Sequence, residues 1–419
     1  MSGTFVIRPQ EMDEFRSCRR AWDFEARVRQ NYIPTTPTAV FNFDKAIHIA
    51  LAVFYFPAMD DWNRSIVRPL AIQGFQRAMR EDRTAYEEAA AVTADQDREW
   101  ERYLELGDAV LNRYFDWAIP EDDFESILAD EDIWVPIADP WHPGLELGTL
   151  DQQPVRFFGR IDQLISDAQD EYWIVSHRVV WEDWEDDEAL LADEDALRAQ
   201  WAVEVSYPQL KVAGTIYNEL RVSRAESDHA TSPDEGTTSS DLRDMTKGVR
   251  HLNLRRSPLT PLGKELGLPV PVLEGLVGSI EPPAAAVRPH TSPPVTGLDR
   301  IEARAGNDVV RRTHVRRAPR SIEAAGMRIA EHVLEVRDRE VAVPPNPSVE
   351  KCSACAYAKP CAELNDGRDT AAVMASEYRK RSEEEFEEVG LRWSATRRAQ
   401  RASLGGASLK PQNVKFRWG

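Results

Sequence analysis

The cysteines are the residues whose spacing points most directly to chemistry. The chain has four, and three of them lie within a span of ten residues inside the segment "VEKCSACAYAKPCAEL" at 349–364. These three are Cys352, Cys355 and Cys361, whereas Cys18 lies in "MDEFRSCRRAWDF" near the other end of the chain. A site that uses all four thiols must therefore bring the two ends of the chain together.

Disulfides are one use for such thiols, and they belong to oxidising compartments and small secreted folds. The N-terminal stretch "MSGTFVIRPQEMDEF" has no basic region followed by an apolar one. The sequence also has no apolar run of about 18 residues, the length that predicts a membrane span. We therefore expect a soluble, cytoplasmic protein that has no membrane partner.

Metal binding is the other use, and two metals fit four thiolates. Structural zinc sites of this kind usually combine two short Cys-x-x-Cys pairs, and this chain has one. A 4Fe–4S cluster takes the same ligand set, and its larger core tolerates uneven spacing and a distant donor. The spacing favours a 4Fe–4S cluster, with zinc as the alternative.

Length and charge limit the partners of the chain. Its 419 residues are enough to bury a hydrophobic core without disulfide or metal cross-links. The formal net charge is −19, so a polyanion is not attracted by the molecule as a whole. DNA binding would depend on local basic patches, such as "VRRTHVRRAPR" at 310–320 or the tail at 390–419, which has seven Lys or Arg and no acid. The run "WEDWEDDEALLADEDA" at 181–196 is, by contrast, strongly acidic.

Hydrophobic periodicity divides the chain into three regions. Residues 1–120 predict a helical section, 121–369 a mixed core and 370–419 a helix followed by the basic tail. The predicted helices are 11–30, with Cys18 in its middle, 43–56, 65–90, 95–118, 198–221, 319–338 and 369–389. The predicted strands lie in "DIWVPIA", "VRFFGRIDQLISD", "EYWIVSHRVVW" and the Arg-rich segment 309–317, and loops are expected at 222–242 and 280–297.

The chain resembles the RecB-like branch of the PD-(D/E)XK nuclease superfamily. The resemblance rests on this order of elements, the segment "FFGRIDQL", the "PNPS" before the cysteine loop and the one-plus-three cysteine layout. Within that branch the chain is similar to the iron–sulfur members, such as AddB-type helicase–nucleases and CRISPR-associated iron–sulfur exonucleases. The resemblance covers about 11–369, with gaps. It implies a restriction-endonuclease-like α/β fold, a mixed sheet flanked by helices, whose N- and C-terminal regions are clasped by a 4Fe–4S cluster on the four cysteines.

The resemblance also implies a centre in which carboxylates hold Mg²⁺ or Mn²⁺. Asp162 in "GRID" matches the metal-binding Asp, and His48 in "FDKAIH" matches the family's His, although Asp44 stands where the family has Gly. Glu131 is the candidate for the upstream acid. The family's Gln-x-x-x-Tyr motif is matched only by its first residue, Gln209.

The family's Asp/Glu-x-Lys motif is replaced here by Ser176-His177-Arg178. Ser176 removes an anionic metal ligand, and Arg178 keeps the charge but not the compact, deprotonatable ammonium of lysine. Alternation along a strand turns His177 away from the face that presents Ser176 and Arg178. We therefore expect a degenerate centre that binds Mg²⁺ or Mn²⁺ weakly.

The leading hypothesis is a catalytically impaired, nuclease-like iron–sulfur protein that binds DNA or a partner protein in DNA processing, recombination or defence. One alternative is an active metal-dependent DNA exonuclease in which Asp183, Glu185 or Glu131 replaces the missing ligand. Another is a scaffold protein whose acidic segment docks a basic partner or mimics DNA. The residues expected to contact DNA phosphates, from the edge of the sheet, are Arg311, Arg312, Arg316 and Arg317.

Overall fold

The structure is a computed structural model that describes residues 4–222 and 298–382, apart from positions 61, 143, 151, 152, 182 and 339. The loop predicted at 280–297, the loop at 222–242 beyond its first residue, and the basic tail lie outside the described residues. In the described ranges no helix is both long and apolar enough to span a bilayer.

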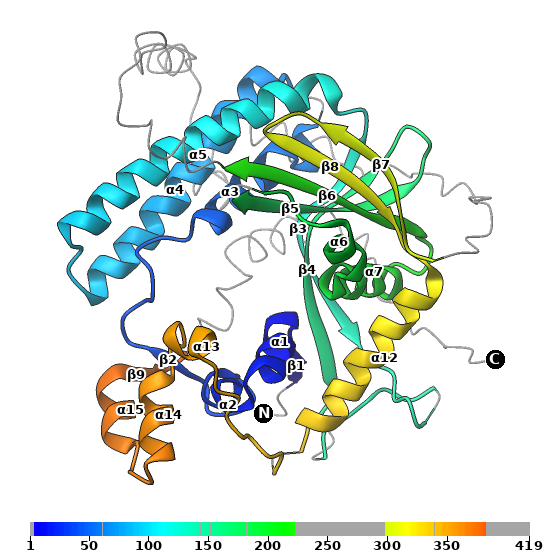
Figure 1. Ribbon diagram of the computed structural model, residues 1–419. Coiled ribbons are helices and arrows are strands. Elements are labelled where there is room, and N and C mark those ends of the chain that lie inside the picture. The colour runs from blue at the N-terminus through cyan, green and yellow to red at the C-terminus, as the bar shows by residue number, and fades with distance from the viewer. Residues whose placement is uncertain are drawn as a thin grey trace, which may run out of the picture.

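A mixed seven-stranded sheet forms the centre of an α/β fold (Figure 1). Its order is β1-β4-β5-β6-β8-β7, and β3 also pairs with β4. The strands are β1 (Phe5–Ile7), β3 (Glu125–Pro136), β4 (Val155–Ser166), β5 (Tyr172–Trp181), β6 (Val212–Val222), β7 (Arg300–Gly306) and β8 (Val310–Arg316). Strands β5 and β6 run parallel, which requires a crossover, and α6 (Asp187–Ala192) and α7 (Glu194–Ser206) supply it.

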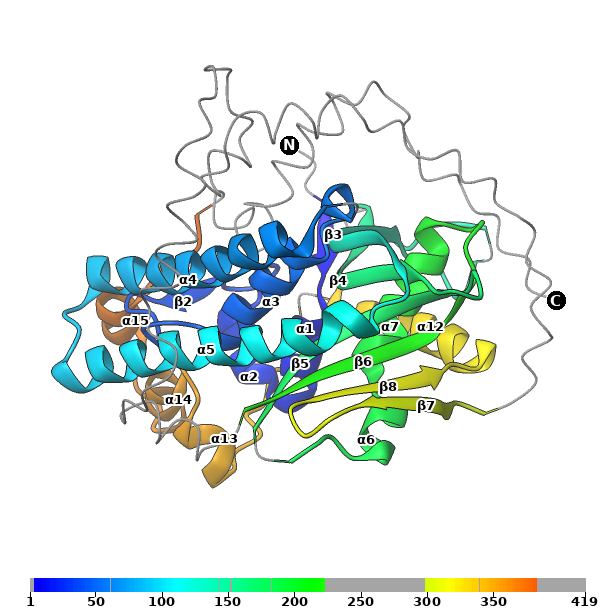
Figure 2. The ribbon, with the colours of Figure 1, turned by 90° about the horizontal axis from the view of Figure 1, so that it is seen from above.

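Helices cover both faces of the sheet (Figure 2). One apolar cluster joins α3 (Phe43–Phe54), α4 (Arg64–Ala89) and α5 (Ala94–Glu121) to β6 and β8. The other joins α1 (Pro9–Ser17), α2 (Arg19–Glu25), α7 and α12 (Pro319–Val336) to the remaining side. The helix–sheet–helix layering predicted from the sequence is therefore confirmed, because each helix buries one apolar stripe against the strands.

Several predicted helices form close to their expected bounds because local capping supports them. The side chain of Asn42 accepts a hydrogen bond from the Lys45 amide at 3.0 Å and starts α3. Thr93 and Gln96 form a reciprocal capping box at the start of α5. The predictions for 43–56, 65–90, 95–118 and 319–338 are thus confirmed to within a few residues.

Three helix predictions were wrong in part. The helix at 11–30 is two helices, because Cys18 has extended backbone torsions (φ −155°, ψ 105°) and separates α1 from α2. The helix at 198–221 ends at Ser206, and the rest is β6, whose nearly continuous burial cannot be told from a buried helix by periodicity. In the last region α15 (Ala371–Glu377) gives way to β9 (Tyr378–Lys380), which pairs with β2 (Tyr32–Pro34).

The sheet forks between β4 and β5. Only Gln163–Ser166 of β4 pairs with Tyr172–Val175 of β5. Beyond this segment β4 runs beside β1, whereas β5 continues beside β6. Asp162 and Ser176 are therefore the first residues past the last pair, at the point where the two strands separate.

The packing of α4 on α5 gives a test of the helical layer. A Cβ atom on Gly107 of α5 would stand 2.0 Å from the ring of Phe75 in α4, whereas one on Gly74 would meet Val53 at an ordinary 3.4 Å. We predict that Gly107→Ala lowers the free energy of unfolding by about 1–3 kcal/mol. The control Gly74→Ala should leave it unchanged or raise it by up to about 1 kcal/mol, from helix propensity. Urea unfolding measures both, and equal effects would contradict this packing.

Candidate functional site

Asp162 and His48 meet at the fork of the sheet. The Nδ1 atom of His48, from the middle of α3, lies 3.2 Å from Asp162 Oδ1. The other carboxylate oxygen accepts a hydrogen bond from the backbone N–H of His177 at 2.8 Å. This N–H belongs to β5 just past its last pair with β4, so the carboxylate satisfies a donor that the separating strands leave open. The fold thus brings together two residues, His48 and Asp162, that the sequence predicted for one site.

The protonation states at the fork follow from burial and charge. Burial alone would lower the pKa of His48, but the charge and hydrogen bond of Asp162, helped by Asp44 and Asp130, raise it to about 9. Burial would raise the pKa of Asp162, yet His48 and the His177 N–H hold it well below its usual value. Near pH 7 the pair is therefore an imidazolium and a carboxylate.

His177 lies on the same side of the sheet as His48, and its ring is neutral. The two ring centroids are 6.2 Å apart, and His177 stacks on Tyr55 at 5.8 Å. Burial, with the positive charges of His48 and Arg312, lowers the pKa of His177 to about 3 against the opposing pull of Asp162. The ring nearest to the charged pair therefore carries no charge near pH 7.

A buried network determines which ring nitrogen of His177 holds the proton. The Nε of Arg312 donates to Asn218 Oδ1 at 2.9 Å, so the amide nitrogen of Asn218 faces His177 Nδ1, also at 2.9 Å. Since an amide N–H₂ only donates, Nδ1 is the acceptor and the proton sits on Nε2. The three residues are register partners across β5, β6 and β8, so the strand pairing itself aligns them.

The same network surrounds the Arg312 guanidinium, which is buried. Its terminal nitrogens donate to Asp122 Oδ1 at 2.5 Å and to the hydroxyls of Tyr55 and Tyr114 at 3.0 Å each. The two hydroxyls lie 2.6 Å apart, and that of Tyr55 donates to Asp122 at 2.9 Å. A buried cation is tolerable only when paired and hydrogen-bonded in this way.

Ser176 and Arg178 point to the opposite side of the sheet, as the predicted alternation required. The Arg178 guanidinium contacts Asp193 at the start of α7, lies 3.4 Å from Glu185 and stands 4.6 Å from the ring centre of Tyr217. The pairing of β5 with β6 is regular through this segment, so Ser176 shares that side. Arg178 therefore has its charge partners on the α7 side, whereas Asp162 has His48 on the α3 side.

The acids near the fork differ from those predicted. Glu131 pairs across the ladder with Ile161, which belongs to the apolar cluster on the α7 and α12 side, so Glu131 does not join Asp162 and His48. Asp130 lies between the register pairs that flank Asp162 and has a left-handed backbone (φ 51°). Its carboxylate contacts Arg160 of β4. Sequence reasoning missed Asp130, and its only signal was its place in the acidic "ADED", which overlaps the start of the predicted strand "DIWVPIA" and lies within β3.

Gln209 lies in the exposed turn between α7 and β6, away from the fork. Tyr172 pairs with Val212 at that end of β6, whereas His177 pairs with Asn218 six residues further along. The expected site position of Gln209 depended on a helix that does not extend past Ser206.

The four arginines expected to contact DNA do not form a free basic edge. Strand β8 lies between β6 and β7, so it is not an edge strand. Arg312 and Arg317 are buried. Arg311 pairs with the buried Glu219 at 2.6 Å, and Arg316 pairs with Glu171 at 2.6 Å. This expectation is therefore corrected, because the strand uses its alternating cations to neutralise acids on neighbouring elements.

The cysteines from the two ends of the chain lie close together. Cys18 and Cys355 pack against one small apolar cluster that includes Phe24 and Tyr357. Burial raises the pKa of the Cys355 thiol, the backbone N–H of Tyr357 opposes this, and the other three thiols add to the rise. Cys18, Cys352 and Cys361 are therefore all close enough to Cys355 to act on its thiol electrostatically.

Hydrogen bonds hold the same two segments together. Asn346 donates to the Ser17 carbonyl at 2.8 Å, and the ammonium of Lys351 lies 3.5 Å from the same oxygen. Arg20 reaches Cys361 Sγ at 3.9 Å. The donor chemistry fits a thiolate-bound metal centre, although no group of three or more His, Cys, Asp or Glu within the described ranges is arranged to hold a metal ion.

Comparison with known proteins adds no assignment: no family model matches the chain, and no curated protein matches its sequence.

The His48–Asp162 pair gives a pH-dependent prediction. Asp162→Asn removes the charge that raises the pKa of His48, so this pKa should fall from about 9 to below 6.5, where burial dominates. NMR titration of the His48 ring measures it. Asp44→Asn, the control, removes a weaker interaction and should cause a smaller fall.

The same pair links stability to pH. The pKa of His48 is raised by folding, so its contribution is complete below about pH 6.5 and is lost as the pH rises through about 9. The pKa of Asp162 is depressed, so its contribution is present above its unfolded value and fades in acid. Loss of the alkaline part in Asp162→Asn is expected in thermal melts, and an unchanged profile would contradict the ion pair.

Proposed function

We propose that this chain is a catalytically impaired relative of the RecB-like PD-(D/E)XK nucleases, of restriction-endonuclease-like fold. It keeps a four-cysteine clasp, holds a 4Fe–4S cluster there, and acts by binding DNA or a partner protein. The observation that carries the proposal is the meeting of His48 and Asp162 at the fork of the sheet, with Ser176 and Arg178 where the family has an acid and a lysine.

The order of elements supports the fold assignment. A helix with His48 precedes a hairpin with "GRID", then a strand, a helix and a parallel strand, as the resemblance implies. The fork also satisfies the physical need of such a centre, since separating strands expose side chains and backbone donors that a continuous ladder would consume.

The electrostatics support impairment. Asp162 is already neutralised by the His48 imidazolium, Ser176 provides no charge, and Arg178 is paired on the other side of the sheet. Hard cations need several oxygen ligands, and loss of one carboxylate weakens their binding. In the described residues the predicted upstream acid, Glu131, faces away from Asp162.

Restoring the family motif tests the proposal. Ser176→Glu combined with Arg178→Lys returns the family's acid and lysine to β5, where residue 176 is the first past the last pair with β4. We expect this double variant to bind Mn²⁺ at least about tenfold more tightly than the wild type, equal to about 1.4 kcal/mol. Calorimetry measures binding, and cleavage of labelled single- and double-stranded DNA measures activity. Adding Asp162→Asn as the control should cancel the gain.

Cleavage assays on the wild type can contradict the proposed impairment. Anaerobically purified protein is expected to show no Mg²⁺- or Mn²⁺-dependent cleavage. Cleavage that disappears in Asp162→Ala would show an active enzyme and contradict impairment. Asp130 then becomes the relocated acid, because it lies opposite Asp162 and its charge acts on His48. Asp130→Asn would abolish activity in that case.

The clasp is tested separately. Cys18→Ala should remove the visible absorbance and iron of the anaerobic protein and lower its melting temperature, because the cluster adds metal–thiolate bonds between two segments that are far apart in the sequence. Lys359→Ala, an exposed change in the same region, is the control. A wild type that is folded and colourless and contains zinc would contradict the cluster assignment but leave the nuclease-like fold intact.

A further inference from the structure

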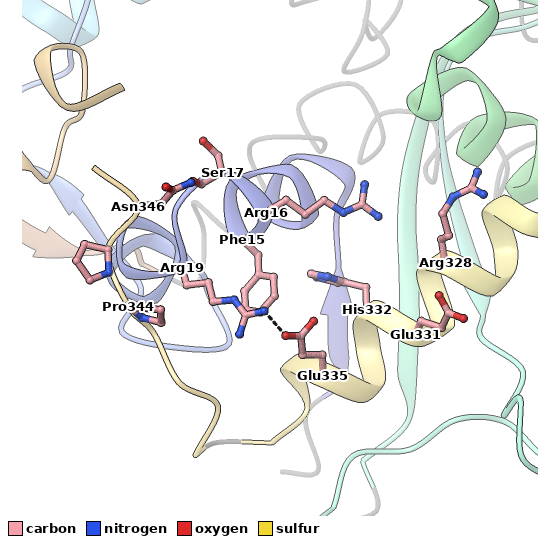
Figure 3. A pocket seen from close by; sticks show the side chains of 11 residues that line it. Phe15, Arg16, Ser17, Arg19, Arg328, Glu331, His332, Glu335, Pro344 and Asn346 are labelled. Atoms are coloured by element: carbon pink, nitrogen blue, oxygen red, sulfur yellow. Dashed lines mark hydrogen bonds and ion pairs between the residues drawn. The ribbon is translucent and has the colours of Figure 1, made fainter. Parts of the chain in front are cut away.

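A cavity of about 700 Å³ lies behind the cysteine clasp, away from the fork of the sheet. One wall is the end of α1 and the start of α2, and the opposite wall is α12 together with the segment that follows it (Figure 3). Its lining residues are Phe15, Arg16, Ser17, Arg19, Arg328, Glu331, His332, Glu335, Pro344, Pro345 and Asn346. Its volume falls in the range of small-molecule sites.

His332 is the residue that sets this cavity apart from an ordinary surface hollow. Its side chain is 6 % exposed, and its Nε2 is buried without a hydrogen-bond partner among the described residues. The ring packs edge-on against Phe15, with centroids 5.1 Å apart. A buried polar atom that lines a cavity and has no partner costs free energy unless something in the cavity pairs with it.

The protonation state of His332 limits which groups can form a hydrogen bond with it. Burial lowers its pKa to about 4, and the nearby Arg16, Arg198 and Arg19 contribute, whereas Asp13 opposes them. The ring is therefore neutral near pH 7 and presents either a donor or an acceptor at Nε2. Glu331 and Glu335 also line the cavity, but Glu335 is paired with Arg19. Arg16 and Arg19, which line it beside His332, favour a negatively charged partner, toward which Nε2–H donates.

Arg16, which lines the same cavity, has N–H donors that are available to a ligand. Within the described part of the chain its only ion pair is with Asp13, at 4.0 Å, which is beyond hydrogen-bonding distance. Arg19 contacts Glu335 across the cavity, and Arg328 is paired with Glu194 at 2.9 Å. Arg16 is thus the least neutralised of the three lining arginines.

We infer that this cavity binds a phosphomonoester, whose oxygens accept hydrogen bonds from Arg16, Arg19 and His332. A phosphate group presents three such oxygens, and guanidinium groups match them in geometry and charge. The remainder of the molecule lies against Pro344 and Pro345. The phosphate comes either from a free small molecule or from the 5′ end of a nucleic acid strand, and the inference does not depend on the proposed function.

The position of the cavity gives the ligand a structural consequence. Ser17 and Arg19 flank Cys18, and Asn346 lies six residues before Cys352. A bound phosphomonoester therefore contacts both segments that carry the cysteines. Ligand and clasp stabilise the same juxtaposition, so each is expected to favour the other.

Calorimetry on the full chain tests the site with three probes: inorganic phosphate, adenosine 5′-monophosphate and a 5′-phosphorylated oligothymidylate with its 5′-hydroxyl counterpart. We expect saturable binding that weakens about tenfold or more in Arg16→Ala, from loss of charged hydrogen bonds. His332→Phe keeps the edge contact with Phe15 but lacks the N–H, and it should weaken binding several-fold. Arg320→Ala, an exposed change on α12 outside the cavity, is the matched control and should bind as the wild type does.

The probes distinguish the sources of the phosphate. Preference for the phosphorylated oligonucleotide over both its hydroxyl counterpart and the mononucleotide assigns a strand end, and equal or tighter binding of the mononucleotide assigns a small molecule. Absence of saturable binding by all three probes, or binding unchanged by Arg16→Ala, overturns the inference. Arg16 is half-exposed, so this variant is informative even where His332→Phe does not fold.

Discussion

The carboxylate of Asp162 is the point on which the centre of this structure depends. It lies where β4 and β5 separate, and it accepts a hydrogen bond from the backbone of one strand while pairing with His48 from the helix above. Without an acceptor there, the fork would leave the His177 N–H without its partner, and His48 would lose the charge that keeps its ring protonated near pH 7. The ion pair therefore holds a helix and two strands in one arrangement.

The row of residues beside it is more deeply buried and also depends on complete hydrogen bonding. His177, Asn218 and Arg312 lie side by side on three strands, and each is hydrogen-bonded to the next. Such a row is favourable only when complete, because every member is buried and a missing partner leaves an unsatisfied group. The arginines of β8 belong to this internal neutralisation, which explains how a strand so rich in cations can lie inside a sheet.

The N-terminal helices and the cysteine region form a second centre of organisation. Residues more than 300 positions apart share hydrogen bonds, an apolar cluster and a short two-stranded sheet. A metal centre on the four cysteines would add to contacts that already exist. The cavity between α1 and α12 lies next to this junction. The four cysteines and His332, whose Nε2 has no hydrogen-bond partner in the described part of the chain, therefore belong to one neighbourhood of the fold.

The sequence by itself determined the features that depend on local pattern. Apolar periodicity and caps predicted α3, α4, α5 and α12, alternation predicted that His177 and Arg178 face opposite sides, and motif position selected His48 and Asp162. Only the tertiary structure decided which faces meet. It showed that Glu131 turns away from the fork, that Asp130 faces it, and that the arginines of β8 are paired. Residues distant in sequence become partners through strand register and helix packing, and these are properties of the whole fold that no local pattern encodes.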